Sequence, residues 1–487
     1  MQLNIRDFGA KGNGVDDDST AWREAMASLS ADGGGDLYVP PGVYKMPPFG
    51  NASWCCDLTA DNVRIIGVPG ASIIRMPAGM PARSVSLIRA NLRTRIALIG
   101  LTLDGNWGAV VGTTDDHLGH NHETQEDPKS HALMIRGCTD VTIRDCRFVQ
   151  TYGDHVWMGH GADPNSSIRS FDVRIEDCRG DVSARNGLTL GGRAARVRIR
   201  DSAFSTIYSQ ALDFEPQTSL VEDVQISGSF FGLWWNPHRS TFNSSVTVDG
   251  GTDESLHARY VRIDNCRIEG CLLIQRAKDV HVRGCRIETM WGGVTWSPVH
   301  VRFHCDDILF ERNTILDNCI PPGRYSHDGS IHIQYYGAGV GIDYQPRNIM
   351  IAGNTIRTQR GVHGIHVNGT AGGLVRLEGN LIDLTDTGNG QGGRGIDLFA
   401  ERPGMRVATR GNRIRNANGA AVRARFTSPA NTARSILLES DHAWDDQLTH
   451  TCTSVVQIDS PQFSDNLAAS TPSSGGGIPV LVSGLPA

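Results

Sequence analysis

Two acidic residues, Asp213 and Glu215, stand two positions apart in the segment Ala211–Pro216 and could work as a pair. Side chains at positions i and i+2 of a strand point to the same face, and their backbones lie roughly 7 Å apart. Carboxyl groups about 6.5–9.5 Å apart leave room for a water between an acid and a base, whereas roughly 5 Å suits a nucleophilic carboxylate. The spacing therefore predicts acid–base chemistry on a glycosidic bond, with Asp213 and Glu215 as catalytic residues.

Further polar residues stand in the two strand-like segments before this pair. Asp154 and His155 are predicted as additional catalytic residues, because stacking of these segments would place Asp154 about 10 Å from Asp213. The same segments offer a flat ring for the face of a sugar, a guanidinium for a carboxylate and an amide for hydroxyl groups. The alternative is a set of surface acids that solubilise the chain and pair with its many arginines. The residues predicted to bind substrate here are Trp157, Arg185 and Asn186.

A second group of polar residues, His332, His366 and Asp397, occupies equivalent positions of three later segments. If these segments stack, the three residues lie about 5 Å apart and roughly 19 Å from Asp213, too far to act on the same bond. A His–Asp acid–base relay, a metal site, a polar ladder and a remote sugar subsite all use such residue types. We predict that the three residues bind substrate, and that the protein needs no metal or other cofactor.

A third group lies in the segment Asp115–Glu123, where histidines and acids are dense. Such side chains are able to hold a divalent metal, but their spacing matches no metal-binding motif. We therefore expect a mobile loop that flanks the groove and ends near His131.

A pattern that recurs along the chain indicates the elements that position these residues. Apolar residues alternate with others and then meet a small or polar position, as in Val141–Phe148, Val197–Phe204 and Val224–Phe231. A second short apolar strand, such as Gly187–Leu190, precedes most copies. Constant strands with spacers of variable length, repeating about every 25 residues, are typical of a parallel β-helix. The predicted fold class is therefore all-β, with the chain wound into a parallel β-helix.

The position five residues after the start of each copy is a Cys, Ser or Asn. Turns stacked about 4.8 Å apart would place like side chains in ladders, in which cysteines pack and asparagine amides hydrogen-bond. The 11 cysteines are therefore predicted to be buried thiols rather than a disulfide framework. The column consists of Cys146, Cys178, Ser202, Ser229, Cys266, Cys285, Asn313, Asn354, Asn380 and Asn412.

The two ends of the chain differ from the repeats. Asp16–Thr20 supply residues that begin helices, and Trp22, Met26 and Leu29 follow at helical spacing. They predict a capping helix over the open end of the β-helix. The predicted domains are an N-terminal cap of helix and strands at 1–45, the β-helix at 46–425, and a C-terminal extension with a flexible tail at 426–487.

The composition excludes several classes of protein. With 487 residues, 39% hydrophobic and 20% charged, the chain is globular rather than disordered. A net charge of −6 argues against nucleic-acid binding through a basic surface. No apolar run approaches the ~20 residues that cross a membrane, and the first residues lack the apolar stretch of a signal peptide. We therefore expect no nucleic-acid partner, no membrane partner and no signal peptide in this chain.

Several segments resemble a known group of proteins. Asp7–Trp22, with its Asp-Phe-Gly-Ala-Lys-Gly-Asn-Gly run, and Gly33–Tyr44 resemble the opening of pectate-lyase-superfamily proteins. Gly153–Gly159, Ala184–Leu190 and Ala211–Pro216 resemble three consecutive turns of glycan-active members from phages and bacteria. The resemblance implies a right-handed parallel β-helix and a polysaccharide as the substrate.

The catalytic motifs of known members are incomplete in this chain. The Asn-Thr-Asp and Arg-Ile-Lys motifs of polygalacturonases are absent from the sequence, although Gly159–Gly161 matches their Gly-His-Gly motif. Tyr152–His155 is similar to a motif of mannuronan epimerases that combines Tyr, Asp and His, but the calcium-binding nonapeptide repeats of many epimerases are missing. The resemblance therefore implies the fold more directly than the reaction.

Together, these features predict a polysaccharide depolymerase of the phage tailspike type, which hydrolyses a bacterial surface glycan. The resemblance also implies a homotrimer, association with virion tail proteins, and a location in the virion tail or outside the cell. One alternative is a lyase or epimerase acting on uronic acids, with Tyr152, His155 or Lys129 as the base near Arg185. Another is a receptor-binding tail protein that holds a glycan without cutting it.

Overall fold

The computed structural model divides the chain into two compact units. Unit 1 comprises Met1–Trp234 and Gly250–Ala258, and unit 2 comprises Trp235–Asp249 and Arg259–Ala487. The residues that the structure describes are 1–78, 85–108, 130–160, 168–216, 219–233, 244–289, 297–317, 329–334, 346–358, 362–368, 374–384, 393–400, 406–417, 419–426, 435–439, 442–444, 452–459 and 467–469.

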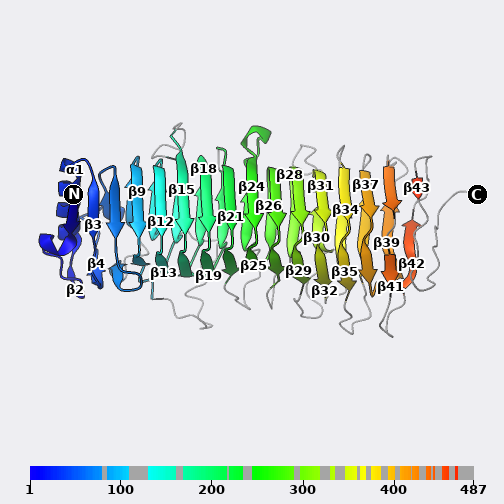
Figure 1. Ribbon diagram of the computed structural model, residues 1–487, viewed down its shortest axis with the longest axis horizontal. Coiled ribbons are helices and arrows are strands. Elements are labelled where there is room, and N and C mark those ends of the chain that lie inside the picture. Colours follow the sequence, from blue (N-terminus) through cyan, green and yellow to red (C-terminus); the bar gives the residue numbers. More distant parts are fainter. Residues whose placement is uncertain are drawn as a thin grey trace, which may run out of the picture. The chain divides into compact units, whose positions relative to one another are not determined.

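Both units are built from parallel strands, and each strand pairs with its equivalent one turn of the chain later (Figure 1). The all-β class and the parallel β-helix are therefore confirmed. The one α-helix among the described residues is α1 (Ser19–Ala31). No helix in the described part of the chain is long and apolar enough to cross a membrane.

In unit 1, each turn of the chain contributes strands to three stacks. The first stack consists of β5 (Trp54–Leu58), β8 (Ser86–Asn91), β11 (Leu133–Arg136), β14 (Val156–Gly159), β17 (Leu188–Gly191) and β20 (Leu212–Glu215). The second consists of β1 (Gln2–Asn4), β3 (Gly35–Tyr38), β6 (Val63–Ile66), β9 (Thr94–Ile99), β12 (Thr139–Arg144), β15 (Ser170–Glu176), β18 (Ala194–Arg200) and β21 (Glu222–Ser227). The third consists of β2 (Asn13–Asp17), β4 (Gly42–Lys45), β7 (Ser72–Arg75), β10 (Thr102–Asp104), β13 (Arg147–Thr151), β16 (Arg179–Ser183), β19 (Ala203–Ile207) and β22 (Phe230–Leu233).

Unit 2 repeats the three stacks, and its strands β26 (Leu272–Arg283) and β28 (Val299–Glu311) are long enough to belong to the first and second stacks at once. The first stack further contains β23 (Val246–Asp249), β30 (Gly329–Gln334), β33 (His363–Asn368), β36 (Ile396–Ala400), β39 (Gly419–Phe426) and β42 (Cys452–Asp459). The second further contains β31 (Arg347–Ala352), β34 (Leu374–Glu378), β37 (Arg406–Arg410), β40 (Ser435–Glu439) and β43 (Leu467–Ala469). The third consists of β25 (Arg267–Glu269), β27 (Arg286–Glu288), β29 (Thr314–Asp317), β32 (Thr355–Thr358), β35 (Leu381–Leu384), β38 (Arg413–Arg415) and β41 (His442–Trp444). The remaining elements are the short helices η1 (Ile5–Phe8) and η4 (Glu254–Leu256) and the strand β24 (Ala258–Asp264).

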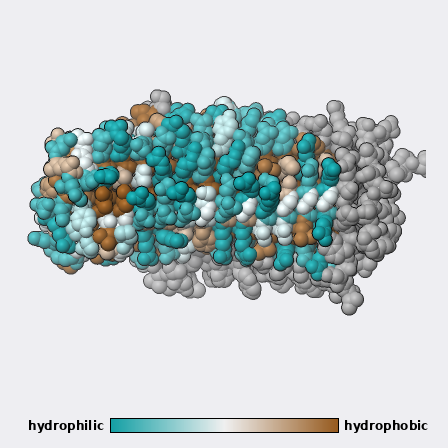
Figure 2. All heavy atoms as spheres, viewed as in Figure 1, coloured by the Kyte–Doolittle hydropathy of each residue, from teal (hydrophilic) through white to brown (hydrophobic). Residues whose placement is uncertain are grey.

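The alternating pattern of each copy separates the interior from the surface. In β12, Val141 and Ile143 are buried, whereas Arg144 is exposed. Hydrophilic residues accordingly cover most of the described surface in the view of Figure 2. Asp140 and Asp145 enter and leave this segment with φ of 55° and 54°. Such left-handed positions suit Asp, Asn and Gly, so these residues mark the corners of the coil.

The predicted asparagine ladder is confirmed inside unit 2. The side-chain amides of Asn313, Asn354 and Asn380 each donate to Oδ1 of the next asparagine in the column, at 2.9–3.0 Å, ending on Asn412. These amides also donate to backbone carbonyls, so the buried polar groups are paired. Nine of the cysteines in the described part of the chain are buried free thiols, as predicted.

The predicted capping helix is α1, which packs its buried face against β3, β5 and η1. Trp22 lies in that face, and its indole nitrogen donates to the carbonyl of Asp57 at 3.3 Å. Asp18 directly precedes the helix, but its carboxylate accepts from the backbone of Lys11 at 2.6 Å instead of capping α1. The parallel stacks themselves begin before residue 45, with β1 to β4, and continue beyond residue 425 through β40 to β43.

Candidate functional site

The first stack of unit 1 aligns the predicted site residues on its outer face. The register pairs Met134 with Trp157, Trp157 with Thr189, and Thr189 with Asp213. Glu215 follows at the end of β20, two positions after Asp213. Only 6% of Asp213 is exposed, so its carboxyl group lies in a poorly solvated place.

Arg185, in the turn before β17, contacts two acids at once. Its Nη1 donates to both carboxylate oxygens of Asp154, at 2.8 and 2.6 Å, and its Nη2 donates to Oε1 of Glu215. The backbone N–H of Asn186 donates to Oδ1 of Asp154, and the N–H of Asp154 donates to Nδ1 of His131. Asp154 is fully buried and Arg185 nearly so. Arg185 is thus paired with two acids of its own chain and holds both carboxylates in place.

The carboxyl groups of Asp213 and Glu215 contact each other. A hydrogen bond joins their carboxyl groups, and the side-chain amide of Asn186 donates to Oδ2 of Asp213 at 3.1 Å. Burial, with the neighbouring charge of Glu215, raises the pKa of Asp213 well above its usual value. Asp213 thus keeps its proton over a range in which an ordinary aspartate is ionised. A hydrogen bond between the carboxyl groups fits the shorter of the two separations considered from the sequence, roughly 5 Å, better than the longer one.

His155 lies inside the coil, away from the acids. Its ring sits between Phe148 and Phe204, with centroid distances of 5.9 and 6.4 Å. Nδ1 shares a hydrogen bond with the hydroxyl of Thr151 at 2.8 Å, and Nε2 is buried with no partner among the described residues. Burial lowers the pKa of His155 to about 3. The predicted catalytic role of His155 therefore does not fit, because the bend before β14 turns the side chain toward the core.

Trp157 lies over two glycines that leave room for its indole. A Cβ atom on Gly159 would come within 2.9 Å of the ring, and one on Gly191 within 3.0 Å. The ring of His131 stacks beside the indole at 6.2 Å, and His160 meets its edge at 5.9 Å. The half-buried ring therefore has a fixed plane, which an aromatic residue that binds sugar requires.

The first stack of unit 2 aligns imidazoles with charged groups. The register pairs His300 with His332, His332 with His366, His366 with Asp397, and Asp397 with Arg423. The rings of His300 and His332 stack 4.9 Å apart, almost parallel, and those of His332 and His366 are 5.0 Å apart. The structure therefore brings the second predicted group together on one face.

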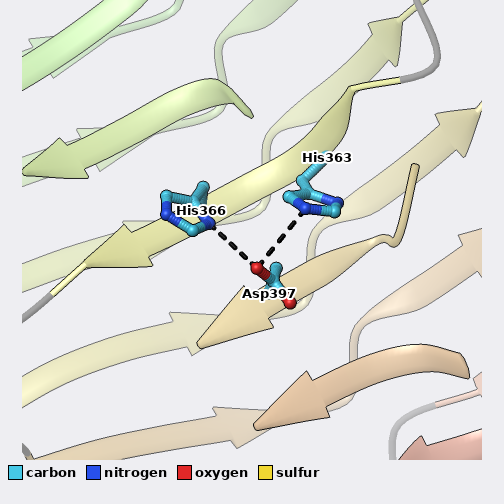
Figure 3. Close-up of side chains that lie close together, drawn as sticks. All are labelled: His363, His366 and Asp397. Carbon is cyan, nitrogen blue, oxygen red and sulfur yellow. Dashed lines mark hydrogen bonds and ion pairs between the residues drawn. The ribbon is translucent and has the colours of Figure 1, made fainter. Parts of the chain in front are cut away.

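His363, His366 and Asp397 form a cluster whose ligand atoms lie within 4.8 Å of one another (Figure 3). The backbone N–H of Arg394 donates to Nδ1 of His363, so the neutral ring carries its proton on Nε2, 3.4 Å from Asp397. Burial lowers the pKa of His363 to about 3 and keeps the ring neutral. A metal needs the lone pair of the nitrogen that faces it, and the other ring nitrogen then normally donates. This tautomer does not fit a metal ligand.

Asp397 is surrounded by hydrogen-bond donors. It accepts from Nδ1 of His366 at 3.1 Å, from Nε of Arg423 at 2.6 Å and from Nη2 of Arg425 at 2.7 Å. Burial opposes its ionisation, but the hydrogen bonds from His366 and Arg423 hold the pKa of Asp397 well below its usual range. Asp397 is thus an ionised carboxylate whose charge is balanced by cations of its own chain.

Sequence reasoning missed several members of the two sites. It missed the arginines of β39 because it did not continue the strand pattern to that segment. The segment Gly419–Phe426 has the same small-apolar alternation as Gly395–Leu398, and one further copy would have placed Arg423 beside Asp397. Lys129 and Asp115–Glu123, which the sequence analysis singled out, lie outside the described residues. The missed residues are His131 and His160 in unit 1, and His300, His363, Arg423 and Arg425 in unit 2.

Known proteins share this architecture. Residues 2–85 match the family described as rhamnogalacturonase A/epimerase, pectate lyase-like. The A-module of mannuronan C-5 epimerase AlgE6 from Azotobacter vinelandii superposes with a TM-score of 0.62 and 19% identity, over 85% of this chain and 99% of that one. The chain therefore has the fold of a right-handed parallel β-helix. Tailspike protein gp49 of Pseudomonas phage LKA1 shares the fold, with a TM-score of 0.57 and 11% identity over 95% of the β-helix protein and 83% of gp49.

Two relatives from Azotobacter vinelandii also match the β-helix protein in sequence. Mannuronan C5-epimerase AlgE6 is 29% identical over 192 residues, which are 39% of this chain and 20% of that protein. Alginate lyase 7 is 33% identical over 119 residues, which are 24% of this chain and 14% of that protein. The β-helix protein therefore matches a fifth or less of the length of these two relatives.

Proposed function

We propose that the β-helix protein is an enzyme that modifies an acidic polysaccharide by acid–base chemistry at Asp213 and Glu215. The observation that carries the proposal is the pair itself, in which the buried Asp213, whose pKa is raised, hydrogen-bonds to the partly exposed Glu215. Such a pair places a proton donor beside a proton acceptor on one rigid strand. Arg185 and Asp154 are positioning residues, which hold Glu215 in place through the guanidinium.

The reaction that fits this pair best is proton removal from a uronic acid unit. The proton next to the sugar carboxylate is the acidic one, and Glu215 would accept it. In elimination, the neighbouring C–O bond breaks and the leaving oxygen takes a proton, which Asp213 would supply. In epimerisation, a proton returns to the same carbon from the other face. The names of the relatives, an epimerase of mannuronan and an alginate lyase, support a polymer of uronic acids.

Hydrolysis is the second candidate, and it uses the same two residues. Asp213 would protonate the glycosidic oxygen as the acid, while Glu215 would activate a water or attack the sugar directly. The route through a water requires carboxyl groups about 6.5–9.5 Å apart, so a substrate would have to break their hydrogen bond. The direct contact between the carboxyl groups therefore favours proton transfer over hydrolysis.

The test compares three products on the same substrates. Polymannuronate, polygalacturonate and a neutral polysaccharide are incubated with the protein in deuterated water, and reducing ends, unsaturated-uronate absorbance and deuterium at the sugar carbon are measured. Absorbance or deuterium on a uronate polymer is expected, with a loss of about 10²–10⁴-fold in Asp213→Asn and Glu215→Gln. Reducing ends without absorbance would establish hydrolysis instead. Binding of a polymer without any product would contradict an enzyme and support a receptor-binding protein.

The surroundings of the protein follow from the same proposal. A glycan is the partner, and the setting is a virion tail or the outside of a cell, where such polymers are met. A homotrimer, as expected from the resemblance to tailspikes, predicts a mass close to three times 52.8 kDa in light scattering. A monomer mass at all concentrations would contradict it.

A further inference from the structure

Unit 2 carries a polar face that the proposed chemistry in unit 1 does not use. Strands β33, β36 and β39 are neighbours in the first stack, and each contributes two outward residues, at positions i and i+2. One position of each strand continues the column that begins with His300 and His332, and the other position forms a second column beside it. We call these six residues the Arg425 face. Its members are His366 and Asn368 from β33, Asp397 and Phe399 from β36, and Arg423 and Arg425 from β39.

The Arg425 face has more positive than negative charge. Arg423 and Arg425 share one carboxylate, that of Asp397, at 2.6 and 2.7 Å. Two guanidinium charges against one carboxylate leave one positive charge in excess. The adjacent His363 is neutral and adds no charge of its own at ordinary pH. The side chain of Arg425 is 33% exposed and that of Arg423 is 14% exposed, so the excess charge is accessible from outside.

Two polar atoms of this face are buried without a hydrogen-bond partner in the described part of the chain. They are Nε of Arg425, which is a donor, and Oδ1 of Asn368, which is an acceptor. The guanidinium of Arg425 lies over the ring of Phe399 at 4.6 Å, which fixes its plane. Asn368, Phe399 and Arg425 are in register on successive strands, so the backbones of Asn368 and Arg425 lie about 10 Å apart with Phe399 between them.

These features together select the chemistry of a ligand. The excess charge and the Nε donor require an anionic group, and guanidinium groups pair well with carboxylates. The Oδ1 acceptor requires a donor, which a simple anion such as sulfate lacks but a sugar hydroxyl provides. Apolar and polar groups side by side are typical of carbohydrate sites. A sugar that carries both a carboxylate and hydroxyl groups provides the anion, the hydrogen-bond donor and the apolar ring face.

We propose that the Arg425 face is a second glycan site, which binds a carboxylate-bearing sugar of the same polymer without acting on it. The proposal rests on the proposed function in one respect, that the polymer contains uronic acids. The carboxylate pairs with Arg423 and Arg425, and a hydroxyl donates to Asn368. The site needs no metal, since the donors around Asp397 already balance its charge.

The experiment counts binding sites by calorimetry on the full chain. An oligomannuronate tetrasaccharide is titrated into the Asp213→Asn variant, which does not consume it. Two sites per chain are expected, with one remaining in Arg425→Gln and one remaining in Trp157→Ala. The matched control is Arg376→Gln, which removes an exposed arginine of β34 outside the Arg425 face and keeps both sites. Thermal melting of each variant confirms that it folds.

A second variant keeps the charge but removes the buried donor. Arg425→Lys retains a cation and loses the Nε donor and the planar stack on Phe399, so about tenfold weaker binding is expected at this site. A neutral mannose tetrasaccharide is expected not to bind at the Arg425 face. Two undiminished sites in a folded Arg425→Gln chain would overturn the proposal, and so would equal binding of the neutral sugar. Inorganic phosphate that displaces the tetrasaccharide at low concentration would also overturn it, because it would show a plain anion site.

The two proposals fail in different ways. If the wild-type chain makes no product from uronate polymers but the Arg425-dependent site binds the tetrasaccharide, the proposed reaction is wrong and the Arg425 face stands. If the wild-type chain turns over the polymer and Arg425→Gln leaves the number of sites unchanged, the reaction stands and the second site is wrong.

Discussion

Asn186 donates a hydrogen bond from its side-chain amide to Oδ2 of Asp213 at 3.1 Å. The carbonyl oxygen of the same amide accepts from the backbone N–H of Gln210, which fixes the orientation of the amide. Asp213 is therefore held on one side by Asn186 and on the other by Glu215, whose own position depends on Arg185. Asp213 is buried in this network, whereas the side chain of Glu215 is 24% exposed.

Removing the guanidinium of Arg185 is expected to destabilise the protein strongly. Arg185→Met leaves the fully buried Asp154 without its charged partner, and loss of one member of a buried pair costs about 3–5 kcal/mol. Chemical denaturation measures this free energy of unfolding. Arg200→Met is the matched control, because Arg200 is 57% exposed and its ion pair with Glu176 contributes at most about 1 kcal/mol. Equal effects of the two substitutions would contradict the central role of Arg185.

The protonated state of Asp213 predicts how stability depends on pH. Unfolded Asp213 loses its proton near the ordinary pKa of 3.8, while burial raises the pKa in the folded chain well above that value. Between the two values the folded chain binds more protons, so its stability falls as the pH rises. Asp213→Asn should remove this contribution from the pH profile of the unfolding free energy.

Asp253 provides a control of opposite sign for that measurement. Hydrogen bonds from the side chain and backbone of Ser255 lower the pKa of Asp253 below its usual value. Its contribution to stability is therefore present above the ordinary pKa and is lost as the pH falls, and Asp253→Asn removes that contribution. A wild-type profile that Asp213→Asn leaves unchanged would show that Asp213 titrates normally in the folded chain.

His155 is expected to affect stability in acid rather than catalysis. Its pKa is about 3 in the folded chain and 6.5 when unfolded, so the unfolded chain takes up a proton first as the pH falls below 6.5. This contribution to stability is lost progressively down to about pH 3. His155→Phe, which keeps an aromatic ring between Phe148 and Phe204, should unfold at a lower pH and retain turnover. A folded His155→Phe chain without turnover would return His155 to the catalytic residues.

Gly191 is expected to control the sugar platform in unit 1. A Cβ atom at this position would come within 3.0 Å of the indole of Trp157, so Gly191→Ala should tilt the ring. Loss of a well-placed aromatic contact costs about 0.5–1.5 kcal/mol, which is roughly three- to tenfold in affinity for an oligosaccharide. Calorimetry measures the change, with Thr189→Ser as a neighbouring substitution that leaves the ring in place. An unchanged affinity in Gly191→Ala would exclude Trp157 from the binding surface.

The carboxyl groups of Asp213 and Glu215 show what sequence spacing predicts and what it leaves open. Their separation of two residues placed both on one face of β20, as expected, because strand side chains alternate. Whether their side chains stand apart or touch depends on Arg185 and Asn186, which arrive from the preceding turn of the chain. The same holds for His155, whose sequence neighbours Asp154 and Trp157 do belong to the site. The bend at His155 turns its side chain inward, and the residue types around it do not predict that bend.

By itself, the sequence determined the coil. Each turn repeats alternating apolar residues, corner positions rich in Asp and Gly, and one member of the column that ends in four asparagines. A parallel stack of turns buries the apolar residues and pairs the asparagines. The tertiary structure decided which outward residues share a proton or a charge, as Asp213 does with Glu215 and Asp397 with Arg423 and Arg425. The physical reason is that the period of the coil is a local property of the chain. Contacts between outward side chains depend instead on register across turns whose connecting segments differ in length.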